Sequence, residues 1–157
     1  MVDASWLKKT KLFESLEESQ LNVILSHSTI ESFPEGKVIF SRGDEATFLY
    51  VLIEGAVDLS VATQEQIGFM SSKIQKEGET FGIPSLLEPF RYNVTAKCLM
   101  ATKVLRIEVR QIKKKMEEDP KMGMEIMKKL ASIYYTRLND LRMGVSKLLK
   151  GFPLKTP

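Results

Sequence analysis

The stretch that decides the fold is FPEGKVIFSRGDEATFLYVLIEGAVDLSV, residues 33–61. In it, short apolar runs alternate with turn sequences that contain Gly36, Gly43 and Gly55. Connections this short need a residue that accepts a positive φ or a close backbone approach. In the last run, valine and leucine alternate with Asp58 and Ser60, which predicts a strand with one buried face. The stretch therefore indicates antiparallel strands rather than helices.

The same pattern continues toward the middle of the chain. We expect a strand from Gly68 to Ile74, a turn over 76–79, and the last strands between Val94 and Ile107. Many short strands at this spacing are typical of an antiparallel sandwich, a jelly roll or a barrel. The sequence thus predicts a mainly β fold.

Helices are predicted on both sides of the strands. Ser15 and Glu18 have the spacing of a capping box before an apolar run that fades near His27. After the strands, residues 108–118 predict one helix, which Asp119-Pro120 ends. A domain of residues 1–120 would then be followed by a long helix over 121–150 and a tail over 151–157.

The long helix carries an unbroken heptad pattern. Its apolar residues are spaced alternately three and four apart: Met124, Met127, Ala131, Tyr134, Leu138, Leu141, Val145 and Leu148. A second apolar set lies on another side of the helix and stops early: Met122, Ile126, Leu130 and Ile133. We expect the second set to pack on the chain's own core and the first to form a homodimer interface, mainly through Met127, Tyr134, Leu138, Leu141, Val145 and Leu148. The alternative is that the whole pattern packs on the chain's own core.

Composition excludes several classes of protein. The chain has 157 residues, 43% of them hydrophobic and 27% charged, which suits one folded domain. No apolar run approaches the ~20 residues of a membrane-spanning helix, and no signal peptide is recognisable. The single cysteine, Cys98, fits a reducing cytoplasm. With one histidine as well, neither a metal site of the usual kind nor a hydrolase triad is expected, so we predict no catalytic residues, no metal and no enzyme.

Charge is distributed unevenly along the chain. Residues 1–109 hold 11 basic and 15 acidic residues, whereas residues 110–157 hold 12 and 5. A basic segment can bind nucleic acid or an acidic partner, but here it lacks interleaved aromatics and a groove-reading motif. We therefore interpret it as the solvated face of a lysine-rich helix.

Four stretches resemble the cyclic nucleotide-binding domain family, which includes catabolite-activator-type regulators and the regulatory subunits of cyclic AMP-dependent kinase. They are Phe33–Ile39 with Gly43-Asp44, Phe48–Val57, Gly78–Gly82 and Val104–Ile107. The resemblance implies a jelly-roll barrel with helices at both ends. It also implies a phosphate-binding cassette in FGIPSLLEPFRYNVT, residues 81–95.

In this family the cassette reads approximately Phe-Gly-Glu-(Leu/Ile)-Ala-Leu, and Pro-Arg-Ala-Ala-Thr follows after a few residues. The resemblance places the ligand site at Gly82, Ile83, Pro84, Ser85, Arg91, Tyr92 and Thr95. Ile83 stands where the family has a glutamate that accepts a hydrogen bond from the ribose hydroxyl. Pro84 has no N–H to donate to the phosphate. Counted from either side, the arginine position falls on Tyr92, and Arg91 comes one residue early.

Each lost bond would cost ~1.5–3 kcal/mol, together roughly a hundred- to ten-thousand-fold in affinity. We therefore expect no cofactor: cyclic AMP or cyclic GMP would bind poorly, and a different small anion or no ligand is expected. An inward-folded Tyr92 or Phe90 would also fill the pocket.

Two functions follow as expectations. The first is a stand-alone, dimeric regulatory sensor that signals to a protein partner through its long helix. The second is a ligand-free dimeric interaction or scaffold domain. The family's DNA-binding members carry a winged helix-turn-helix after the long helix, and residues 151–157 do not supply one, so we expect no sequence-specific DNA binding.

Overall fold

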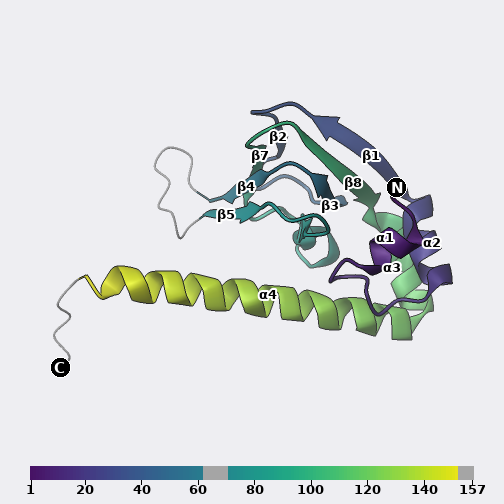
Figure 1. Ribbon diagram of the computed structural model, residues 1–157. Coiled ribbons are helices and arrows are strands. Elements are labelled where there is room, and N and C mark those ends of the chain that lie inside the picture. Colours follow the sequence, from purple (N-terminus) through teal and green to yellow (C-terminus); the bar gives the residue numbers. More distant parts are fainter. Residues whose placement is uncertain (62–70, 152–157) are drawn as a thin grey trace, which may run out of the picture.

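The computed structural model describes residues 1–61 and 71–151, and it consists of a β sandwich with helices along one side (Figure 1). The strands are β1 (Ser28–Phe33), β2 (Val38–Phe40), β3 (Phe48–Glu54), β4 (Val57–Ser60), β5 (Ser71–Ile74), β6 (Thr80–Phe81), β7 (Thr95–Cys98) and β8 (Thr102–Glu108). The helices are α1 (Ala4–Lys8), α2 (Glu18–Ser26), the short 3-10 helix η2 (Ile83–Leu86), α3 (Val109–Glu118) and α4 (Pro120–Leu149).

The strands form two antiparallel sheets of four strands each. One has the order β1-β8-β3-β6 and the other β2-β7-β4-β5. Among the described strands, consecutive ones lie in different sheets, as in a jelly roll, except for β4 and β5, which pair with each other. The predicted mainly β fold is confirmed. Within the described residues the strands make two facing sheets rather than one closed hydrogen-bonded barrel.

Two hydrophobic cores lie on opposite faces of the first sheet, because side chains alternate along its central strand β3. Tyr50 and Leu52 point into the sandwich, where they meet β4, β6 and β7. Leu49 and Val51 point the other way and belong to a second core, which we call the helix-side core and which includes residues of all four α-helices. The central strand β3 is thus buried on both faces, which explains its nearly continuous apolar sequence.

Three details of the sequence prediction are corrected. The capping box belongs to Glu17 and Gln20, and α2 begins at Glu18. The short helix α1, capped by Asp3, was not foreseen. Asp58 and Ser60 are buried, at 6% and 8% exposure, so β4 is covered on both faces rather than one. The predicted strand start at Gly68 lies outside the described residues.

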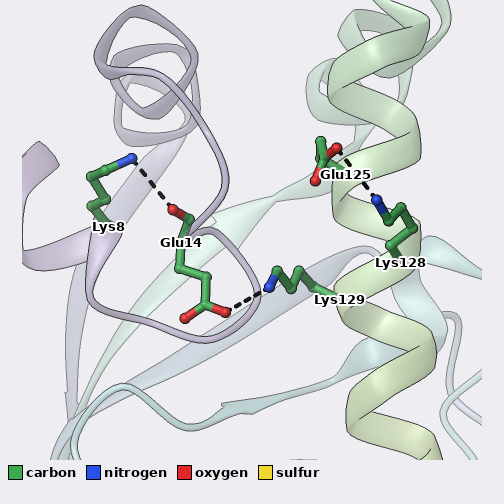
Figure 2. A network of polar contacts seen from close by, with 5 residues as sticks. All are labelled: Lys8, Glu14, Glu125, Lys128 and Lys129. Carbon is green, nitrogen blue, oxygen red and sulfur yellow. Dashed lines mark hydrogen bonds and ion pairs between the residues drawn. The ribbon is translucent and has the colours of Figure 1, made fainter.

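The long helix α4 runs along one side of the sandwich (Figure 1). Only its first half is buried against the domain, through Met122, Ile126 and Leu130. Polar contacts hold the same half: the Lys129 ammonium lies 2.7 Å from the Glu14 carboxylate (Figure 2). No helix within residues 1–61 and 71–151 is long and apolar enough to cross a membrane.

Candidate functional site

The predicted cassette begins where β6 ends, at Gly82. Gly82 has a φ of +78°, and a Cβ there would come within 3.0 Å of the Phe48 carbonyl oxygen. Both features require glycine, so the chain turns tightly past β3 into η2. Ser85 in η2 is fully buried, and its backbone N–H and hydroxyl both donate to the Gly82 oxygen, at 3.1 and 2.8 Å. Two of the polar groups predicted to face a phosphate are therefore bonded internally.

The next two cassette residues point away from the sandwich interior. Ile83 is 1% exposed and packs in the helix-side core with Leu86. Pro84 is half-buried at the start of η2. Position 83 thus contributes to the contact between η2 and the helices, and its side chain does not line the space between the sheets.

Tyr92, near the end of the cassette, lies in the sandwich interior. Its side chain is 4% exposed, and its ring stacks on Phe40 with centroids 3.7 Å apart and planes 14° apart. The hydroxyl donates to the Phe48 carbonyl oxygen at 2.7 Å and accepts from the Phe48 N–H at 3.2 Å. Tyr92 therefore contacts the second sheet through its ring, at Phe40 of β2, and the first sheet through its hydroxyl, at the backbone of β3.

Other aromatic side chains pack beside Tyr92 in the sandwich interior. Tyr50 stacks on Phe81 at 5.1 Å and on Phe40 at 5.8 Å between ring centroids. Burial raises the pKa of both Tyr50 and Tyr92, so both phenols stay neutral at physiological pH. The interior beside the cassette is occupied by packed, uncharged rings.

One cation lies at the margin of these rings. The Arg106 guanidinium lies 4.5 Å from the centroid of the Phe48 ring and pairs with Glu31 at 3.3 Å. Its positive charge is therefore already matched by a carboxylate and an aromatic face.

Arg91 lies on the outside of the domain. Its Nη1 donates to the Gly43 carbonyl oxygen at 3.2 Å, and the side chain is exposed. The residue before Gly43, Arg42, donates its backbone N–H to the Thr95 hydroxyl oxygen at 3.0 Å. The predicted site residues thus separate into three groups: Gly82, Ser85 and Tyr92 around β3, Ile83 and Pro84 on the helix side, and Arg91 and Thr95 near the 41–44 turn.

The heptad residues of α4 form the second candidate surface, which we call the α4 seam. Four of the six predicted interface residues are exposed, by 36% to 46%: Met127, Leu138, Leu141 and Leu148. Val145 is half-buried. Tyr134 is half-buried against the helix-side core, and burial raises its pKa. In the part of the chain that the structure describes, no residue of α4 after Leu130 is fully buried.

Comparison with known protein families gives the decisive observation. The family model of the cyclic nucleotide-binding domain matches residues 30–119, from β1 to the end of α3. This chain belongs to the cyclic nucleotide-binding domain family. The resemblance seen in the glycines and strands of the sequence is confirmed.

Two curated relatives are each 29% identical to this chain over the aligned residues. The global nitrogen regulator of Nostoc sp. is 29% identical over 105 residues, which are 66% of this chain and 47% of that protein. The cAMP-dependent protein kinase regulatory subunit of Candida albicans is 29% identical over 151 residues, 87% of this chain and 31% of that protein. The chain therefore spans less than half the length of these curated relatives.

Among solved structures, a protein from Geobacter metallireducens GS-15, assigned as a cyclic nucleotide-binding protein, has a TM-score of 0.77 and 28% identity. The match covers 88% of this chain and 99% of that one. The Thermus thermophilus catabolite activator protein, at 23% identity and a TM-score of 0.66, shares the fold.

Sequence reasoning missed the aromatic partners of Tyr92 in this cyclic nucleotide-binding domain. Phe40, Tyr50 and Phe81 lie on three different strands, and nothing in their spacing brings them together. A usable signal was present in β3, where Phe48 and Tyr50 share one face of the strand.

Proposed function

We propose that this chain is a dimeric regulatory module of the cyclic nucleotide-binding domain family that acts on a partner protein through α4. In this proposal the Tyr92 side chain fills the cassette, so cyclic nucleotides are excluded from it. The observation that carries the proposal is the buried position of Tyr92, stacked on Phe40 and hydrogen-bonded to Phe48. The degenerate sequence of the cassette supports it independently.

The energetic argument concerns the displacement of Tyr92. A nucleotide bound in the family's manner needs an arginine where Tyr92 lies, and it needs the space that the ring fills. Emptying a packed aromatic position costs about 3 kcal/mol or more. If the open state is that rare, the apparent affinity falls by at least about a hundredfold. Affinity would fall further because Ile83 cannot accept a bond from the ribose and Pro84 has no N–H to donate to the phosphate.

The α4 seam supports dimerisation. A helix of 30 residues is ~45 Å long at 1.5 Å per residue, and only its first half is buried against its own domain. The remaining leucines form a row that a second copy of the same helix would cover. In the proposed dimer, packing of two such helices would bury Leu138, Leu141 and Leu148.

A sensor of a different small ligand is the second candidate, because Arg91 lies beside Tyr92 in the chain and points to solvent. A thermal-shift screen separates the two. A ligand at 100 times its dissociation constant adds ~2.7 kcal/mol to stability. We expect cyclic AMP, cyclic GMP and inorganic phosphate each to leave the melting temperature of the wild type unchanged, while cyclic AMP shifts the Candida albicans regulatory subunit used as control. A shift by inorganic phosphate would favour the sensor of a different small ligand, and a shift by either cyclic nucleotide would contradict the closed cassette.

Restoring the family glutamate alone is expected to destabilise the domain. Ile83→Glu would place a carboxylate in the helix-side core at a position 1% exposed, where it has no basic partner among the core residues. We expect a loss of several kcal/mol in the free energy of unfolding, measured by urea denaturation. Pro84→Glu, which adds the same charge at the neighbouring half-exposed position, is the matched control and should cost much less. Equal effects of the two substitutions would contradict the placement of Ile83.

A further inference from the structure

Arg137 makes a polar contact between α4 and β6, the strand that leads into the cassette and that we call the cassette strand. Its Nη2 donates to the Thr80 carbonyl oxygen at 2.6 Å, across 57 residues of sequence. The side chain is half-buried, and desolvation lowers the pKa of the guanidinium from its ordinary value, with the Tyr134 phenol and the Glu79 carboxylate acting in the opposite direction. A cation held in such a place needs its hydrogen bond, because desolvation is costly.

The Thr80 carbonyl needs this donor equally. β6 is the edge strand of its sheet, so one side of it has no neighbouring strand. Leu52 donates to the Glu79 oxygen, and Val51 and Thr80 form the next pair along the ladder. Hydrogen-bonded pairs alternate in an antiparallel ladder, so the Thr80 carbonyl points away from β3. Thr80 is 4% exposed, and water cannot readily take the place of Arg137.

Arg137 lies where α4 leaves the core of its own domain. The buried residues and the Glu14 ion pair hold α4 only as far as Leu130. Beyond them, Ile133 and Tyr134 pack partly on the core, and Arg137 makes the last polar bond from α4 to the sandwich that the described residues contain. The exposed leucines of the seam begin at the next residue, Leu138.

We propose that Arg137 is a positioning residue that fixes α4 to the edge of the cassette strand β6, so that the cassette and the α4 seam move as one body. A displacement of α4 by one residue, ~1.5 Å, breaks the bond and leaves the buried Thr80 carbonyl and the half-buried guanidinium without this partner. The contact therefore selects one register of the helix. This inference rests on the proposed role of α4 as the output of the module.

Hydrogen exchange tests the anchor directly. Arg137→Met keeps the apolar stem and removes the donors. We expect amides of residues 134–149 to exchange at least about tenfold faster, with Thr80 and Phe81 also faster and β8 unchanged. Arg142→Met, at an exposed arginine five positions on, is the matched control and should leave all of these rates as in the wild type. Unchanged exchange in Arg137→Met would overturn the proposal.

Arg137→Lys serves if the methionine variant does not fold. Lysine keeps a charge and a single donor group but loses the planar fork, so intermediate exchange rates are expected. Exchange rates identical to the wild type in the lysine variant, at all amides of residues 134–149, would count against a specific role for the guanidinium.

Coupling to the cassette is a readout that a purely structural anchor would not move. Tyr92→Phe releases the Phe48 backbone inside the sandwich, and we expect it to change exchange at residues 134–149 in the wild type but not in Arg137→Met. Strictly additive effects of the two substitutions would overturn the coupling.

The same measurements in a Leu138→Asp/Leu141→Asp background separate this inference from the dimer proposal. If that background is monomeric and Arg137→Met still accelerates exchange, Arg137 acts within one chain. If the wild type proves monomeric, the dimer proposal fails while the Arg137 test stands unchanged.

Discussion

Tyr92→Ala is expected to lower the free energy of unfolding by about 3–5 kcal/mol. The substitution removes a ring that stacks on Phe40 at 3.7 Å and leaves the Phe48 carbonyl without the phenol that donates to it. The cavity would open between the two sheets, whose hydrogen-bonded strands are rigid, so the surrounding residues can fill it only in part. Urea denaturation followed by circular dichroism measures the effect.

Tyr92→Phe is the matched control because it keeps the ring and removes only the hydroxyl. We expect it to cost about 1–3 kcal/mol, through the unsatisfied Phe48 groups. An alanine variant within about 1 kcal/mol of the wild type would show that the ring is not packed in solution, and the cassette would then be open.

The second large effect is expected at the α4 seam. Leu138→Asp together with Leu141→Asp should weaken dimerisation at least about a hundredfold, because the dimer would bury two carboxylates from each chain. Both leucines are exposed by more than 40% in the single chain, so the fold itself should survive. Sedimentation equilibrium gives the dissociation constant of the dimer. The urea midpoint of the doubly substituted chain checks that the fold is kept.

Asn139→Asp with Ser146→Asp adds the same charge on the same helix, at exposed positions outside the seam. This control should remain dimeric. A wild-type chain that sediments as a monomer at tens of micromolar would contradict dimerisation through α4, whatever the variants do.

The fold was predictable because its determinants are local. Gly55 shows why: its φ is +110°, and a Cβ there would lie 2.6 Å from the Thr102 hydroxyl. A glycine between two apolar runs is a signal that sequence alone displays. The sequence predicted Asp58 and Ser60 on an exposed face of β4, but both are buried. Alternation of apolar and polar residues identifies one buried face and carries no information about what covers the other.

The candidate site was less predictable because it depends on side-chain direction. Counting along the chain assigned Tyr92 to the arginine position, but it could not establish that the phenol reaches Phe48. The direction of Ile83 depends on η2, a single turn whose orientation is set by packing against α3 and β3. The bond from Arg137 to Thr80 joins residues that no periodicity relates.

Calorimetric titration of cyclic AMP into the wild-type protein tests the closed cassette most directly. With Tyr92 buried against Phe40 and Phe48, the account predicts no saturable heat at nucleotide concentrations up to about 1 mM, the limit at which binding is worth ~4 kcal/mol. Saturable binding with a micromolar dissociation constant would contradict it, since the nucleotide would then displace Tyr92 at little cost and the domain would be a cyclic nucleotide sensor after all.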